Sequence, residues 1–174
     1  MSLHIIVDGY NVIRQSKELR ILDLRDMQAG RETLQDILVE YRKSKGHRIT
    51  IVFDGTDAIS QEARRQRFRG IEILFSRNGE TADTVIKRMA AREKERALVV
   101  SSDRDIVSFV TSVGSATIGS KAFEDKMFQA IYRAETGGTE EPPETGWVPT
   151  TRKKGPGRRL PKKKRRNQGK TIKL

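Results

Sequence analysis

Acidic residues stand at the end of several apolar runs in this chain of 174 residues. Asp8, Asp54 and Asp103 each follow a short run rich in Val, Ile or Leu, and Asp83 lies near the start of a helical stretch. Such runs are typical of parallel strands buried on both faces, and ligands of these sheets bind beyond the carboxyl ends of the strands. Carboxylates gathered there repel one another unless a divalent cation neutralises them. The pattern therefore predicts a metal site.

The segments that would position these residues alternate between strand and helix. We expect strands over residues 5–7, 49–53, 71–75, 97–101 and 116–118. Apolar side chains recur at helical spacing in four other segments, which are residues 27–45, 80–95, 105–113 and 121–134. Residues 61–69 are dense in arginine and fit either a helix or a loop. This alternation predicts a doubly wound α/β domain.

The composition excludes several kinds of site. The chain has no cysteine, which excludes disulfides, thiolate metal sites and cysteine nucleophiles, and we expect a cytoplasmic protein. Only His4 and His47 could supply imidazole, and neither has the spacing of a ligand, so zinc is not the expected metal. The apolar run before Asp8 is too short for a signal peptide, and no stretch reaches membrane-spanning length, so we expect no membrane partner.

The net charge of +12 belongs to one end of the chain. Residues 152–174 contain 12 Lys and Arg and no Asp or Glu, so the rest of the chain is formally neutral. We expect a domain over residues 1–135, a linker rich in Gly, Pro, Thr and Glu over 136–151, and a disordered basic tail over 152–174. The densest basic run, in which we predict contacts to RNA, is Lys162, Lys163, Lys164, Arg165 and Arg166.

The tail admits more than one anionic partner. Phosphate neutralisation by Lys and Arg supplies affinity for nucleic acid that does not depend on sequence. The basic run also fits a nuclear localisation signal, and anionic lipid is a further alternative, although the tail lacks the apolar face of a membrane-binding helix.

Four short motifs follow one another along residues 3–135. They read IIVDGYNVI from residue 5, IVFDG from residue 51, GETAD from residue 79 and VVSSDRD from residue 99. The fragment DGxN alone has little specificity, but the four motifs in this order resemble the NYN nucleases of the PIN-like superfamily, most of all their bacterial YacP-type branch. The resemblance implies a PIN-like (Rossmann-like) α/β fold, with a central parallel sheet and helices on both faces, and a metal-dependent ribonuclease site. Members of the YacP type include a ribosome-associated endoribonuclease that cuts messenger RNA, which implies RNA and the ribosome as partners. For the basic tail, the resemblance to a bacterial family favours ribosomal or other structured RNA as the partner.

The acidic residues suit the chemistry of such a nuclease. Hydrolysis of a phosphodiester needs an activated water and neutralisation of the charge that builds up on the phosphate. Hard oxygen ligands suit Mg²⁺ or Mn²⁺ for both tasks. We expect the metal ligands to be Asp8, Asp83, Asp103, Asp105 and Glu80. We expect the catalytic residues to be Asp8, Asn11, Asp54, Asp83 and Asp103, supported by Ser101 and Ser102.

Each of these assignments has a simpler alternative. A single Asp after a strand also fits a turn or a helix N-cap, and the site rests on four such residues occurring together. Glu80 enters the set because it lies three residues before Asp83 at the expected start of a helix, where the two would share a face. Asn11 enters as a neutral side chain that could orient a water or a phosphate without adding negative charge.

A second basic stretch lies between the second and third expected strands. If it lies on the side of the acidic residues, its arginines could bind RNA phosphates and its Phe68 could stack on a base. The alternative is a solvated surface segment that pairs with Glu62 and Glu72. The arginines in question are Arg64, Arg65, Arg67 and Arg69.

The sequence thus predicts an endoribonuclease that uses Mg²⁺ or Mn²⁺ to cut single-stranded RNA, with messenger RNA on the ribosome as the expected setting. One alternative is a non-catalytic RNA-binding or ribosome-associated factor that keeps the acidic pocket. The other is a PIN-like nuclease that acts on DNA.

Overall fold

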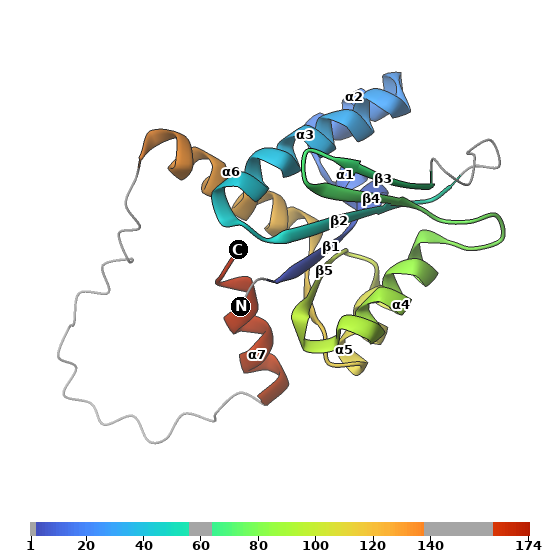
Figure 1. The fold of residues 1–174 in the computed structure, drawn as a ribbon, viewed down its shortest axis with the longest axis vertical. Coiled ribbons are helices and arrows are strands. Elements are labelled where there is room, and N and C mark those ends of the chain that lie inside the picture. The colour runs from blue at the N-terminus through green and yellow to red at the C-terminus, as the bar shows by residue number, and fades with distance from the viewer. Residues whose placement is uncertain (1–2, 56–63, 138–161) are drawn as a thin grey trace.

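The computed structural model describes residues 3–55, 64–137 and 162–174. A six-stranded sheet with the strand order β3-β4-β2-β1-β5-β6 forms its centre, and helices cover both faces (Figure 1). The strands are β1 (His4–Asp8), β2 (Arg48–Phe53), β3 (Arg65–Phe68), β4 (Ile71–Phe75), β5 (Ala97–Val100) and β6 (Ala116–Ile118). The helices are α1 (Gly9–Gln15), α2 (Lys17–Arg25), α3 (Met27–Lys45), α4 (Ala82–Glu93), the 3₁₀ turn η2 (Lys94–Arg96), α5 (Arg104–Ser112), α6 (Ser120–Thr136) and α7 (Lys162–Thr171).

The strand pairing brings the carboxyl ends of three strands together. β1 lies between β2 and β5 and is parallel to both, with Asp8 opposite Val52 and Val7 opposite Val100. β4 and β6 extend the parallel sheet on either side, and β3 alone is antiparallel, to β4. Any side chain that follows β1, β2 or β5 therefore emerges at the same edge of the sheet.

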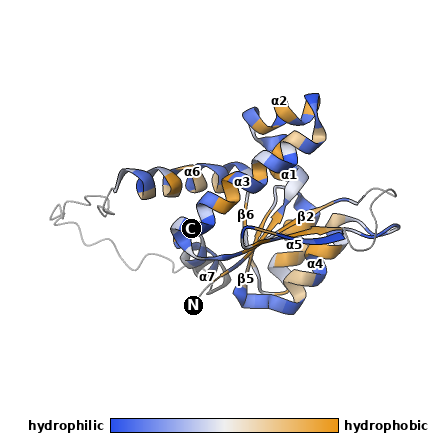
Figure 2. Ribbon diagram, turned by 45° about the horizontal axis from the view of Figure 1, so that its top comes forward, coloured by the Kyte–Doolittle hydropathy of each residue, from blue (hydrophilic) through white to orange (hydrophobic). Residues whose placement is uncertain are grey.

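The sheet separates two apolar cores. Alternate residues of β1 point to opposite faces. Ile5 and Val7 belong to the larger core on the side of α3 and α6, whereas Ile6 packs on the other side with residues of α4 and α5. Figure 2 shows apolar residues concentrated in the strands at the centre and polar residues on the outer surfaces of the helices. Complete burial of one such aliphatic side chain contributes roughly 1.5–3 kcal/mol, so this two-sided core fixes the sheet that carries the site.

Most expected elements are confirmed. α3 occupies the predicted residues 27–45 and ends at Gly46, whose φ of 68° is the left-handed conformation of a helix stop. The other predicted strands and helices are present, with ends that shift by a few residues. The sequence prediction missed α1 and α2, which divide at Ser16, the C-cap of one and the N-cap of the other. Among the described residues, no helix is both long enough and apolar enough to cross a membrane.

The arginine-rich stretch is a strand in its second half, which corrects the expectation of a helix or a loop. Arg65 and Arg67 of β3 lie opposite Leu74 and Glu72 of β4. The buried Glu72 carboxylate accepts a hydrogen bond of 2.6 Å from Arg65 Nε. This buried partner allows an arginine-rich segment to form an edge strand.

Part of the tail that we expect to be disordered over 152–174 forms a helix in the described residues, since residues 162–174 contain α7. The Asn167 side chain accepts a bond of 2.8 Å from the Thr117 N–H and donates one of 3.2 Å to the Thr117 carbonyl oxygen, so it satisfies backbone groups of the edge strand β6. Leu174 is buried in the larger core, and its carbonyl oxygen accepts a bond of 3.3 Å from Tyr41 Oη. An amide pair and an apolar anchor therefore hold a segment whose composition alone predicts disorder. Most of the expected linker, from residue 138 onward, lies outside the described residues.

Candidate active site

Four aspartates meet at the carboxyl edge of the sheet. Asp8 is the last residue of β1, Asp54 directly follows β2, Asp103 is the N-cap of α5 just after β5, and Asp83 lies in the first turn of α4. The pKa of Asp8 and that of Asp83 are both raised, first by burial and then by the charges of neighbouring aspartates. For Asp8 these neighbours are Asp83 and Asp54, and for Asp83 they include Asp103 and Asp54. The structure thus brings the four predicted carboxylates into one acidic site.

Asp8 is the most buried of the four, with 8% of its surface exposed. Its Oδ2 accepts a hydrogen bond of 2.9 Å from Ser101 Oγ, and its Oδ1 accepts one of 3.3 Å from the Asn11 N–H at the start of α1. Both bonds favour the charged carboxylate, but burial outweighs them and raises the pKa of Asp8 to about 6. At neutral pH the site therefore holds a buried negative charge, which a bound cation would stabilise.

A close approach of α1 to β2 helps to place Asp8. Gly9 follows Asp8, and a Cβ atom at this position would overlap the Phe53 ring. The same ring makes an edge contact with Tyr10 and stacks on Phe75, with centroid distances of 5.1 and 5.6 Å. Tyr10 also accepts a bond from Arg31, so its role here is packing beside the site.

Asp54 positions the helix that carries Asp83. Its Oδ1 accepts a bond of 2.7 Å from the N–H of Ala82, the first residue of α4. The next residue, Gly55, donates its N–H to Ser76 Oγ at 2.9 Å, which ties the loop after β4 to the end of β2. A helix N-terminus favours negative charge, so the same arrangement that Asp54 holds in place also supports Asp83.

Asp103 acts as an N-cap, as the simpler alternative proposes, and it also faces the site. Its Oδ1 accepts bonds of 2.8 and 3.2 Å from the N–H groups of Asp105 and Ile106. Ser101 Oγ accepts a bond of 3.2 Å from the Asp103 N–H while it donates to Asp8, so one serine links the Asp8 carboxylate to the backbone of Asp103. Asp105 is more exposed and forms an ion pair with Lys87 of α4, which places a cation at the rim of the site.

Asn11 is fixed by two donors. Its Oδ1 accepts bonds of 2.9 Å from the Ser102 N–H and 2.6 Å from Ser120 Oγ at the start of α6. Because a backbone N–H can only donate, the atom that faces Ser102 is the amide oxygen. The amide NH₂ group has no hydrogen-bond partner in the described part of the chain. This group is able to donate to a water or to a phosphate oxygen, and the role of Asn11 in orienting either one stays a prediction.

Glu80 does not share a helical face with Asp83, which corrects the reason for choosing it as a ligand. α4 begins at Ala82 with Thr81 as its N-cap, so Glu80 lies before the helix. Its carboxylate forms an ion pair with Arg88, and its charge is not among the causes that raise the pKa of Asp8 or Asp83. Glu80 belongs to the neighbouring cavity that is lined by arginines.

The predicted RNA-binding arginines do not share one environment. Arg64 donates to the Asn78 side chain at 3.2 Å, and Arg65 pairs with Glu72 as the alternative interpretation expects. Arg69 lies over the Phe68 ring and 4.0 Å from Asp36. Arg67 lines a separate cavity with Glu72 and two other arginines. Glu62 and the loop around it lie outside the described residues.

The basic run of the tail lies away from the acidic site. Lys162, Lys163, Lys164, Arg165 and Arg166 form the first half of α7, which contacts β6 (Figure 1). Their contact with RNA remains a prediction.

Three supporting residues escaped the sequence prediction. Ser76, Ser120 and Lys87 contact Gly55, Asn11 and Asp105 respectively. The one local signal was for Ser120, which follows the strand over 116–118 and so reaches the same edge.

The donor set fits a hard divalent cation. The described residues contain no group of three His, Cys, Asp or Glu side chains placed so that they could hold a metal ion. Mg²⁺ is usually held by one or two carboxylates, with waters and substrate phosphates completing its shell, so a tighter cluster is not required. Asp8 and its neighbours supply only oxygen atoms. The pKa of Asp8 and that of Asp83 are raised, first by burial and then by neighbouring aspartates, so a bound cation would favour their charged forms.

Comparisons with known proteins identify the family and the fold. The sequence model of the YacP-like NYN domain matches residues 5–166. A curated relative, the uncharacterized protein YacP of Bacillus subtilis (strain 168), is 31% identical over 86 residues, which cover 49% of this chain and 50% of the relative. The chain thus spans about half the length of this curated relative.

Two crystal structures of Rae1 (YacP) from Bacillus subtilis share the fold. One, of a mutant form, has a TM-score of 0.62 and 23% identity, and the match covers 76% of this chain and 79% of the other. The second has a TM-score of 0.61 and 25% identity and covers 79% of each chain. The central, mostly parallel sheet flanked by helices is therefore common to these proteins.

Proposed function

This chain belongs to the YacP-like NYN domain family, and from that premise we propose that it is a metal-dependent endoribonuclease that cleaves single-stranded RNA at the acidic site. NYN domains are generally nuclease domains and typically use divalent metals, which supports a nuclease-type, PIN-like function. The observation that carries the proposal is the buried Asp8 carboxylate, whose pKa is raised to about 6, beside Asp54, Asp83 and Asp103.

The residues of the acidic site would have different roles in RNA cleavage. Asp8 and Asp103 would hold Mg²⁺ or Mn²⁺ together with Asp83. Ser101 orients the Asp8 carboxylate and also accepts the backbone N–H of Asp103. When bound, the ion supplies neutralisation of the phosphate charge and a lower pKa for the attacking water. The Asn11 amide donates to a phosphate oxygen or to this water, held in place by its bonds to Ser102 and Ser120.

The setting of the reaction is part of the proposal. We propose messenger RNA, free or on the ribosome, as the substrate. We propose the cytoplasm as the compartment in which the protein acts. The basic residues 162–166 would add affinity for RNA, which weakens steeply as salt rises.

Cleavage mapping with matched variants tests the proposal. End-labelled single-stranded RNA and DNA of one sequence are incubated with the protein in Mg²⁺, Mn²⁺ or EDTA, with and without ribosomes. We expect internal RNA cuts that require a divalent ion, and a loss of at least about 100-fold in rate for Asp8→Asn. Asp36→Asn, an exposed change on α3 with the same loss of charge, serves as the control.

Each other outcome points to a different conclusion. Equal rates for Asp8→Asn and the wild type would refute the assigned site. RNA binding without cleavage under any of these conditions would favour the non-catalytic factor. Preferential cuts in DNA would favour a PIN-like nuclease that acts on DNA.

A further inference from the structure

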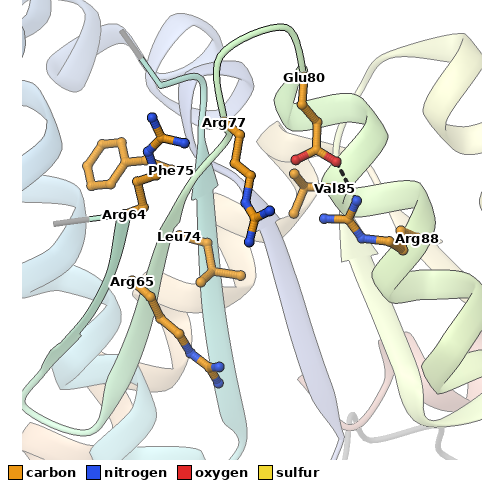
Figure 3. A pocket seen from close by; sticks show the side chains of 8 residues that line it. All are labelled: Arg64, Arg65, Leu74, Phe75, Arg77, Glu80, Val85 and Arg88. Carbon is orange, nitrogen blue, oxygen red and sulfur yellow. Dashed lines mark hydrogen bonds and ion pairs between the residues drawn. The ribbon is translucent and has the colours of Figure 1, made fainter. Parts of the chain in front are cut away.

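A cavity rich in arginine lies beside the acidic site, between α4 and the β3–β4 edge of the sheet. It has a volume of about 310 Å³. Figure 3 shows Arg77 extending into the space between Leu74 on the strand side and Arg88 on the helix side. Among the described residues that line it, Arg64 and Arg65 bring the guanidinium groups to four, against one carboxylate, Glu80.

The arginines of this cavity differ in how far their charge is compensated. Arg88 pairs with Glu80, and Arg65 pairs with Glu72, which lies below the cavity on β4. Arg64 has a neutral partner, the Asn78 side chain at 3.2 Å. In the described residues, the Arg77 guanidinium has neither an ion pair nor a hydrogen bond. The cavity therefore carries excess positive charge that is centred on Arg77.

The cavity and the acidic site share one loop. Ser76, next to Arg77, accepts the Gly55 N–H and donates its own N–H to the Phe53 carbonyl oxygen at 2.9 Å. The same loop leads to Ala82, which is bonded to Asp54. Arg77 is thus tied through short contacts to the backbone that carries one of the four aspartates.

The walls of the cavity suit a nucleotide. Leu74, Val85 and the half-buried Phe75 give it an apolar side against which a ribose or a base can pack. Guanidinium groups bind phosphate with two parallel hydrogen bonds, and such charge-assisted bonds are about twice as strong as neutral ones. A second cavity shares Arg77, Glu80 and Arg88, so the positive surface continues across the loop.

We propose that this arginine cavity binds a backbone phosphate of the nucleic-acid strand next to the phosphate that is cleaved, with Arg77 as its main contact and Arg64 and Arg88 as its flanks. This inference deepens the proposed function and rests on it for the identity of the substrate. Glu80 tunes the cavity by neutralising Arg88, a different role from that of a metal ligand.

A salt titration without metal tests the contact. Binding of a fluorescent single-stranded octauridylate is measured by anisotropy in EDTA for the full chain, for Arg77→Gln and for Arg92→Gln. Arg92 lies on the same helix, and its recorded partner is Glu93 at 3.6 Å, so it controls for the loss of one charge outside the cavity. We expect Arg77→Gln to weaken binding roughly five- to tenfold at low salt and to lower the slope of log K against log salt by about 0.7.

Two further arms separate a direct contact from a general loss of fold or charge. Replacing single phosphates of the probe by methylphosphonate should reveal one position at which Arg77→Gln causes no additional loss. Glu80→Gln frees Arg88 and should tighten binding about two- to threefold in EDTA, a gain that unfolding cannot produce.

The proposal is overturned if Arg77→Gln and Arg92→Gln give the same slope, or if no methylphosphonate position removes the effect of Arg77→Gln. Because the probe is bound without metal and is not cut, these results are independent of the cleavage assay. A full-rate Asp8→Asn enzyme would refute the catalytic site and leave the phosphate contact standing.

Discussion

Replacing Asp8 by asparagine is expected to stabilise the metal-free protein above pH 6 and to destabilise it below about pH 4.5. The Asp8 pKa is raised from its ordinary value of 3.8 to about 6, chiefly because burial disfavours the charged form. The folded protein therefore holds this proton more tightly than the unfolded chain does. The stability contributed by the protonated group is fully present below pH 3.8 and is lost as the pH rises through 6.

The magnitude follows from the two pKa values. A change from 3.8 to about 6 corresponds to about 3 kcal/mol, the free-energy cost of the ionised carboxylate above pH 6. Asparagine removes this cost, but its single oxygen can accept only one of the two bonds that Ser101 and Asn11 donate, a loss of about 1 kcal/mol. Asp8→Asn should therefore raise the free energy of unfolding by about 2 kcal/mol at pH 8 and lower it by about 1 kcal/mol at pH 3.5.

Urea unfolding in EDTA between pH 3.5 and pH 8, followed by circular dichroism, measures this difference. His4, whose pKa is lowered by burial, also makes stability depend on pH, but its contribution is the same in both proteins and cancels in the difference. Asp36→Asn removes an exposed carboxylate and should not reproduce the change of sign. A difference between Asp8→Asn and the wild type that stays constant with pH would refute the burial argument.

Three further predictions follow from the site and its supports. Millimolar Mg²⁺ or Mn²⁺ should raise the melting temperature, because an ion that binds only the folded state stabilises it. Asp83→Asn should reduce this rise in melting temperature. An unchanged rise in this variant would exclude Asp83 as a ligand. Gly9→Ala should lower the free energy of unfolding by about 1–3 kcal/mol in urea titrations, because its methyl group overlaps Phe53, and Phe53→Leu should recover part of the loss. Asn167→Ala should cost about 1–2 kcal/mol and speed hydrogen exchange at the Thr117 amide, whereas protection equal to the wild type would show that α7 does not hold this edge.

Local signals explain why much of the fold could be predicted. The 27–45 helix carries its stop at Gly46, and the strands over 71–75 and 116–118 are bounded by residues that break them. The aspartates could be found for the same reason, since each follows a strand or starts a helix, and a parallel sheet brings such positions to one edge.

The missed features depend on contacts between distant residues. β3 is stable with its arginines because Glu72 lies on the next strand, and no local pattern marks that pairing. α7 is held by Asn167 and Leu174, whose partners Thr117 and Tyr41 lie 50 and 133 positions away in the sequence. The expected helical position of Glu80 was wrong for a related reason, because α4 begins at Ala82, two residues later than expected, with Thr81 as its N-cap.

On our proposals, the two basic regions would serve different parts of an RNA. The end of the tail docks beside the amino end of β2, where the Lys173 carbonyl oxygen accepts a bond of 3.2 Å from the His47 ring. The aspartates lie beyond the carboxyl ends of the strands. A strand that is held by α7 must therefore pass along the sheet before it reaches Asp8. The arginine cavity shares a loop with the acidic site and needs no such path. On our proposals, α7 increases the affinity for long or structured RNA, while Arg77 sets the register of the few nucleotides at the cut.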